Sequence, residues 1–159
     1  AVEIINTATD LNTSDLNFSS AMNGVTLDKS TNSIYVIGSD ANKTEISKIV
    51  NTEISKTITN SAITNSRFLT FDNNQLYFTS GTGIYTISPD LTNFPETSMF
   101  NVSDNSWSTL YGFDVINGKV YSSDANSFTQ NSIITIYNLS GSVLKTFSTE
   151  IGTNGFYKN

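Results

Sequence analysis

Short runs of alternating apolar and polar residues recur along the whole chain, and three stretches follow the same plan. An apolar run ends in Asp, a polar turn follows, and a second apolar run is centred on a tyrosine. The three stretches begin at Gly24, Phe68 and Leu110, and their tyrosines are 42 and 44 residues apart. Alternation of this kind is typical of β-strands with one buried face. Because three copies recur at a nearly fixed period, the pattern predicts a repeated β unit.

Two more β-type runs follow each tyrosine run, so each unit has four strands, named A to D in chain order. The C strands are expected at 44–50, 83–88 and 133–138, and the D strands at 54–59, 95–100 and 143–148. Four short antiparallel strands every 42–44 residues match the blade of a β-propeller, whose period is about 40–45 residues. The sequence therefore predicts an all-β fold made of β-propeller blades.

The two ends of the chain keep the same register. The expected units are strands C and D of a leading blade at 1–22, whole blades at 23–65, 66–107 and 108–152, and the first strand of a closing blade at 153–159. Propellers close with at least four blades. About three and a half blades therefore predict part of a larger ring, with the remaining blades supplied by the same or another chain. The alternative is a four-bladed ring in which the two end segments share one blade.

Residues that recur once in every blade are expected to be structural. The recurring tyrosines are Tyr35, Tyr77 and Tyr121, and they are predicted to be packing residues. The recurring aspartates are Asp28, Asp72 and Asp114, and they are predicted to form the turns between strands A and B.

The tetrapeptide Ser-Asp-Ala-Asn occurs twice, at 39–42 and at 123–126, each time directly after a B strand. The middle blade has no Asp in the corresponding segment, 79–83. The favoured interpretation is structural: Asp40 and Asp124 begin the B–C turns, where a carboxylate accepts backbone N–H groups. A ligand-binding role is the alternative, and the missing middle copy argues against a symmetric site.

The composition limits the chemistry that the chain can perform. Asn, Ser and Thr make up 65 of the 159 residues, which suits turns and solvent-facing strand positions. The sequence contains no His and no Cys. The chain by itself therefore cannot form a Ser-His-Asp triad, a Cys-His pair or a zinc finger. With a net charge of −6 and no basic stripe, the chain is predicted not to bind nucleic acid. No cofactor or metal is predicted, and an oxygen-only Ca²⁺ site in the Asp/Asn loops stays open.

The third unit and the tail resemble the closing blade of the YncE-like, surface-layer-type bacterial β-propellers. The matching segments are Tyr111 to Val115, Gly118 to Tyr121, Ser123 to Ala125, Ile136 to Tyr137, Ser140 to Gly141, Leu144 to Phe147 and Gly155 to Tyr157. The chain departs from the family at Leu110 and Asn154, where Pro is common. The resemblance implies a ring of seven or eight blades with this chain as its C-terminal half, exported to the periplasm or cell surface, often as a lipoprotein. It also implies an outer-membrane transporter as a partner in some relatives.

In a propeller the D–A and B–C loops share one face, where ligands commonly bind because loops vary on a rigid scaffold. The candidate ligand-binding residues on this face are Asn23, Arg67, Trp107, Tyr111 and Asn154 from D–A positions, and Asp40 and Asp124 from B–C positions. Arg67 is the only Arg, and its guanidinium can fork onto a carboxylate or phosphate; the favoured interpretation is a surface Arg that pairs with a nearby acid. Trp107 is the only Trp, and stacking on a sugar or flat ring competes with packing between blades.

Two functions from different classes follow. The preferred hypothesis is a non-catalytic exported or cell-surface propeller that binds a small molecule, a glycan or a protein partner through its loop face. The alternative is a propeller enzyme of hydrolase or lyase type, whose catalytic groups lie mostly on a missing half of the ring. Carboxylates are available for such chemistry, but none stands out in the sequence as buried or paired.

Overall fold

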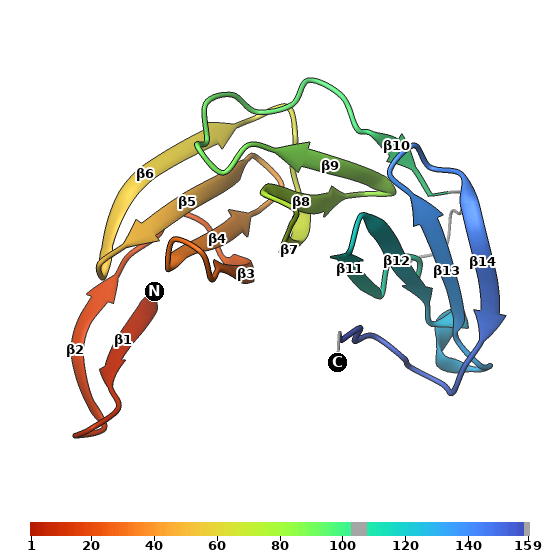
Figure 1. The fold of residues 1–159 in the computed structure, drawn as a ribbon, viewed down its shortest axis with the longest axis horizontal. Coiled ribbons are helices and arrows are strands. Elements are labelled where there is room, and N and C mark those ends of the chain that lie inside the picture. Colours follow the sequence, from red (N-terminus) through yellow and green to blue (C-terminus); the bar gives the residue numbers. More distant parts are fainter. Residues whose placement is uncertain (103–107, 158–159) are drawn as a thin grey trace.

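The chain folds into an arc of antiparallel β-sheets in the computed structural model, which describes residues 1–102 and 108–157 (Figure 1). A two-stranded sheet comes first, and three four-stranded sheets follow it. The leading pair is β1 (Val2–Asn6) and β2 (Leu11–Leu16). The first four-stranded sheet contains β3 (Met22–Asp28), β4 (Ser33–Ser39), β5 (Thr44–Val50) and β6 (Glu53–Asn60).

The other two sheets repeat this order. The second contains β7 (Ser66–Asp72), β8 (Gln75–Ser80), β9 (Gly83–Ile87) and β10 (Phe100–Asn101). The third contains β11 (Gly112–Ile116), β12 (Lys119–Asp124), β13 (Ile133–Asn138) and β14 (Val143–Ser148). In each sheet the strands pair in chain order, and Figure 1 shows β3, β7 and β11 on the inside of the arc. The predicted fold of about three and a half propeller blades is confirmed.

Helix is nearly absent from the described part of the chain. A single 3₁₀ turn, Asn126–Phe128, lies between β12 and β13. In the described residues no helix has the length and apolar character needed to cross a bilayer.

Two apolar cores lie between neighbouring sheets, so each four-stranded sheet is stabilised by the next one. The first core joins β3–β6 to β7–β10, and Tyr35 is fully buried in it. The Tyr35 ring lies parallel to Phe71 with centroids 6.2 Å apart, and its hydroxyl donates to the carbonyl of Pro89 at 3.1 Å. Tyr77 occupies the same place in the second core, and Tyr121 contacts Phe156 of the C-terminal segment. The recurring tyrosines are therefore packing residues as predicted: Tyr35 and Tyr77 pack between blades, and Tyr121 packs against the C-terminal segment.

The recurring aspartates do not occupy equivalent positions, and the prediction for Asp114 is wrong. In the strand register Asp114 lies opposite Tyr121, as Thr70 lies opposite Tyr77, so Asp114 is equivalent to a threonine. The third A–B turn comes later, at residues 117–118, between Ile116 and Lys119. The apolar-Asp pattern suggested an alignment that is two residues too early.

The other two aspartates both end an A strand but act differently. Asp28 accepts the Ser30 N–H at 2.9 Å within its own turn, as predicted. Asp72 instead accepts the N–H groups of Asn117 and Gly118, at 2.9 and 2.8 Å, in the A–B turn of the following blade. Its carboxylate therefore ties two blades together.

The D strand of the middle blade is shorter than expected. A strand was predicted at 95–100, but β10 contains only Phe100–Asn101, and the segment from residue 88 to residue 99 has no regular strand. Pro89 and Pro95 lie in this segment, and a proline has no N–H to donate to a sheet. Leu91 anchors the loop because it is fully buried in the first core.

The predicted A strand at 153–159 is not a strand in the structure: residues 153–157 have no strand hydrogen bonds, and the last two residues lie outside the described part. The segment nevertheless follows β11 closely, because a Cβ on Gly112 would lie 2.6 Å from the Asn154 carbonyl oxygen. An A strand pairs with the B strand of its own blade. No such strand lies beside residues 153–157 in the described chain.

Candidate functional site

The D–A and B–C loops meet at one end of the sheets, as the propeller register predicts. Backbone hydrogen bonds join them in both the first and third blades. The Ser39 N–H donates to the carbonyl of Ala21 at 3.0 Å, and the Ala125 N–H donates to Ser108 at 3.2 Å. We call this end of the molecule the loop face. It contains every described residue that the sequence singled out for ligand binding; Trp107 lies outside the described residues.

The two repeated aspartates are engaged in their own turns. Asp40 accepts the N–H groups of Asn42 and Lys43 through Oδ1, at 2.7 and 3.1 Å. These bonds, the one from Asn42 above all, lower the pKa of the Asp40 carboxyl. Asp124 accepts the Asn126 N–H at 2.8 Å and the Ser108 hydroxyl at 2.6 Å. Both carboxylates therefore form turns, the role that the structural interpretation gave them.

Asn23 connects two blades at the loop face. Its side-chain amide donates to the carbonyls of Ser39 and Ser66, at 3.1 and 2.9 Å. Ser39 ends β4 of the same blade, whereas Ser66 begins β7 of the next blade and directly precedes Arg67. Asn23 therefore fixes the backbone from which the Arg67 side chain projects.

Arg67 is exposed at the start of β7, on a β-bulge. The bulge places Phe68 at a φ of +55°, and a bulge of this kind re-aims the neighbouring side chain. The guanidinium carbon lies 5.2 Å from the centre of the Phe68 ring. No carboxylate in residues 1–102 or 108–157 forms an ion pair with it. The favoured interpretation of a surface ion pair thus finds no partner in the described chain.

Tyr111 and Asn154 lie next to each other on the third blade. The Tyr111 N–H donates to Ser123 at 2.9 Å, and its ring meets the Phe128 ring edge-on with centroids 4.8 Å apart. The Asn154 backbone passes against Gly112, the residue after Tyr111. Tyr111 therefore directly precedes β11, and Asn154 runs beside the start of that strand.

Four of the predicted residues form a row along the loop-face ends of the inner strands. Asn23 is the second residue of β3, Arg67 is the second residue of β7, and Tyr111 precedes β11. The Phe68 and Phe113 rings, 6.1 Å apart, join the second and third of these positions, and Asn154 extends the row. We call these four residues the rim row. Asp40 and Asp124 lie in the turns beside it.

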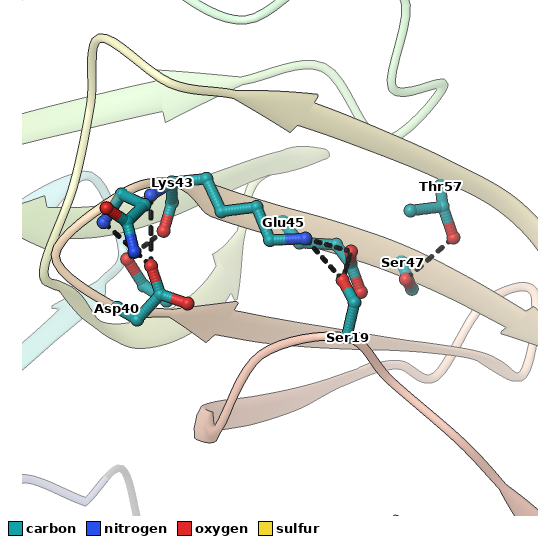
Figure 2. Close-up of polar contacts among 8 residues, drawn as sticks. Ser19, Asp40, Lys43, Glu45, Ser47 and Thr57 are labelled. Atoms are coloured by element: carbon teal, nitrogen blue, oxygen red, sulfur yellow. Dashed lines mark hydrogen bonds and ion pairs between the residues drawn. The ribbon is translucent and has the colours of Figure 1, made fainter.

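A second polar cluster on the loop face was not predicted from the sequence (Figure 2). The Ser19 hydroxyl donates to Glu45 Oε2, and Lys43 Nζ donates to Ser19 Oγ at 2.5 Å. Lys43 Nζ also lies 3.7 Å from Glu45 Oε2, and Glu45 is buried at 8% exposure. The available signal was the carboxylate of Glu45 in a predicted C strand, because a charge buried in a sheet requires a partner. Ser19 itself gave no signal, since it comes from a linker 26 residues away.

Asp114 is the described carboxyl whose environment disfavours its charged form. Burial raises the pKa of Asp114, and the charge of Asp72 adds to this effect. The Thr70 hydroxyl and the Val115 N–H oppose the shift by donating to Oδ1, at 2.5 and 2.7 Å. The group lies between two inner strands, at a distance from the loop face. In the described residues no group of three or more His, Cys, Asp or Glu side chains is arranged to hold a metal.

No family model matches the chain, and no curated protein matches it. Solved structures do. The chain is similar to a glutaminyl cyclase from Myxococcus xanthus, with 14% identity and a TM-score of 0.58 over 82% of this chain and 52% of that one. It is also similar to a quinonprotein alcohol dehydrogenase-like protein from Bacteroides thetaiotaomicron, with 16% identity and a TM-score of 0.61 over 79% of this chain and 33% of that one.

A structure of a nidogen/laminin complex gives a similar result, with 15% identity and a TM-score of 0.57 over 80% of this chain and 49% of that one. All three similar chains are β-propellers. At these identities the likeness shows the fold alone. The chain spans between a third and about half of the length of the structures it matches.

Proposed function

We propose that this chain is a non-catalytic propeller module that binds an acidic small molecule or acidic glycan along the rim row, with Arg67 as the anion-binding group. The observation that supports the proposal is the exposed Arg67 guanidinium, which has no carboxylate partner in the described chain. A planar guanidinium presents its donors in a fork that fits a carboxylate or phosphate.

The surroundings of Arg67 favour a bound anion over a solvated side chain. The aromatic face of Phe68 lies beside the guanidinium and limits its rotamers, so less conformational entropy is lost on binding. Asn23 fixes the preceding carbonyl through its bond to Ser66. Tyr111, half-exposed one blade away, offers a hydroxyl and a ring to the remainder of the ligand.

The proposal extends to location and assembly. The resemblance of residues 110–157 to YncE-like closing blades supports export to the bacterial surface or periplasm, with a nutrient and an outer-membrane transporter as the partners to test first. The same resemblance supports a ring of seven or eight blades. The similar propellers are two to three times as long as the part of them that this chain covers.

Thermal shift tests the proposal, because a ligand that binds the folded state raises the melting temperature. The probes are citrate, glucuronate, inorganic phosphate and, as a neutral control, glucose. We expect at least one anionic probe to raise the Tm of the wild type and glucose to leave it unchanged. Arg67→Ala is expected to abolish that shift, while Lys29→Ala, a change at an exposed cation in an A–B turn, keeps it. Equal shifts in Arg67→Ala and wild type would end the proposal.

A hydrolase is the second candidate, and Ser19 is the observation that favours it. Ser–Lys pairs act as nucleophile and base in some hydrolases, and Lys43 Nζ lies 2.5 Å from Ser19 Oγ. A base of this kind needs a free amine, whereas Lys43 forms an ion pair with Glu45 at 3.7 Å. The contact therefore fits a structural role, in which it holds the linker at Ser19 against the first blade, better than a catalytic one. Ester hydrolysis that disappears in Ser19→Ala would reverse this ranking.

A further inference from the structure

The face of the first four-stranded sheet that looks toward β1 and β2 leaves large apolar side chains in solvent. Val25 is 65% exposed and Leu27 45% exposed, both on β3, and Ile34 on β4 is 38% exposed. Leu27 pairs directly with Ile34, and residues paired across antiparallel strands point to the same face. The three side chains therefore form one apolar strip along the inner half of the sheet.

In the next blade the residues at the positions of the strip are covered by a neighbouring strand. The comparison therefore shows which cover the strip lacks. By strand register Leu69 on β7 corresponds to Val25, since each lies opposite the equivalent residue of its B strand. Leu69 is only 7% exposed. In the third blade Phe113, the equivalent of Val25, is 7% exposed, and Val115, the equivalent of Leu27, is 2% exposed.

The B strand of the preceding blade covers these positions inside the arc. Tyr35 on β4 stacks against Phe71, the equivalent of Leu27, with the rings 5° from parallel. Tyr77 on β8 belongs to the core that buries Phe113 and Val115. Within residues 1–102 and 108–157 the leading sheet consists of β1 and β2, which correspond to strands C and D, so this part of the chain places no B strand over the strip.

The leading sheet also offers an edge and a cavity to such a strand. β1 is hydrogen-bonded to β2 alone in the described chain, which leaves its other edge unpaired. A cavity of about 410 Å³ lies between the leading sheet and the first blade. It is lined by Val2, Ile4 and Leu16 on one side and by Ile34 and Ile49 on the other, and the polar residues Glu3, Asn32, Asn51 and Thr52 complete the lining.

We infer that this face binds an antiparallel two-stranded β-hairpin supplied by a polypeptide segment outside residues 1–159. One strand of the hairpin extends the leading sheet by pairing with the free edge of β1, the mode known as β-augmentation. That strand carries an aromatic side chain, Tyr by the pattern of this chain, over Leu27 and Ile34. The second strand lies along Val25 on the inside of the arc.

The chain contains its own probe for this site, the hairpin of residues 66–82, which holds β7, β8 and the turn after them. A variant with a second copy of this hairpin fused directly before Ala1 places a B strand next to β1. We expect the fusion to raise the Tm and to slow amide hydrogen exchange in Val2–Asn6 at least tenfold. Replacing the tyrosine of the added copy by Ser is expected to remove most of both effects.

Substitutions in the strip provide the matched control. Val25→Lys and Leu27→Asp change exposed side chains, so each is expected to fold alone and to lose the gain from the added hairpin. The proposal is wrong if the fused hairpin leaves exchange in β1 unchanged, or if both strip variants keep the full gain. Sedimentation of the unfused chain distinguishes a hairpin from a second copy of the chain as the occupant of this face. If the chain is a dimer and Leu27→Asp dissociates it, a second copy occupies the face and the proposal is wrong.

Discussion

At the scale of single residues, the carboxyl groups of this chain differ in their pKa shifts, which depend on burial and on the hydrogen-bond donors around each group. Asp28 and Asp40 accept hydrogen bonds from their own turns, and these bonds lower the pKa of each carboxyl. The pKa of Asp114 is raised instead, by burial and by the nearby charge of Asp72. The same residue type therefore stabilises the fold at one position and opposes it at another.

Asp114→Asn is predicted to stabilise the protein at pH 7. A carboxyl whose pKa is raised on folding contributes stability only below its unfolded pKa, about 3.9, and that contribution is lost as the pH rises through the folded value. The amide oxygen of Asn still accepts from Thr70 and Val115. Each kcal/mol gained raises the Tm by about 2–4 °C in a chain of this size. Thermal denaturation should show a higher Tm for the variant at pH 7 and no gain near pH 3; a lower Tm at pH 7 contradicts the assignment.

Asp28→Asn is predicted to do the reverse. The hydroxyls of Thr31 and Ser30, at 2.6 and 2.7 Å, are the largest causes of the lowered pKa. A carboxyl with a lowered pKa contributes stability above its unfolded value, and the contribution is lost as the pH falls through the folded value. The variant should therefore melt at a lower temperature than the wild type at pH 7, and the difference should shrink as the pH falls below the unfolded pKa of about 3.9. Equal melting temperatures at pH 7 would show that the turn does not need the charge.

At the scale of elements, close contact between inner strands depends on a few glycines. A Cβ on Gly24 in β3 would lie 2.8 Å from the Leu69 nitrogen and 2.9 Å from the Phe68 carbonyl carbon, both backbone atoms of β7. Neither atom belongs to a flexible side chain. The first two blades can approach this closely only without a side chain at residue 24.

Gly24→Ala is accordingly predicted to destabilise the fold by about 1–3 kcal/mol, the range for overpacking a tight contact. Urea unfolding followed by circular dichroism measures the loss. Gly155→Ala is the matched control, because its Cβ would meet only the exposed ring of Tyr157, at 3.0 Å. If the two variants are equally stable, β3 and β7 do not pack as described.

The strands could be predicted from the sequence because alternation and period point to the same answer. The tyrosine of each B strand marks its blade, and the predicted C strand at 44–50 matches β5. What failed depended on information outside the repeat. Asp114 was aligned by residue type, although the register places it with Thr70. Two prolines shortened β10, and the 153–157 segment has no strand beside it.

The candidate site was predictable to the extent that it follows the repeat. The register correctly placed Asn23 and Arg67 at the loop-face ends of inner strands. The Ser19–Lys43–Glu45 cluster could not be predicted, because its serine belongs to a linker whose path depends on the packing of the leading sheet. Long-range contacts of this kind leave no periodic mark on the sequence.

At the scale of the whole molecule, the arc has buried apolar cores between its blades and two exposed surfaces of different character. The two cores share the middle blade, so β7–β10 supports both of its neighbours. The first blade exposes the apolar strip of Val25, Leu27 and Ile34, whereas the loop face carries the rim row. On a molecule with a net charge of −6, Arg67 differs from the exposed lysines because it carries the only guanidinium, whose planar fork of donors fits a carboxylate or phosphate. An anionic ligand is therefore expected at Arg67, beside the Phe68 ring.

The most direct measurement is an amide chemical-shift titration of the ¹⁵N-labelled chain with citrate and with glucuronate. The account predicts saturable shifts at Arg67, Phe68, Tyr111 and Asn154, with the Arg67 side-chain Nε–H among the largest. It also predicts that Arg67→Lys weakens binding, because an ammonium cannot form the two-pronged contact. Shifts confined to the Lys43 region or to the A–B turns, or the same affinity in Arg67→Ala, would contradict the claim that the rim row is the binding site.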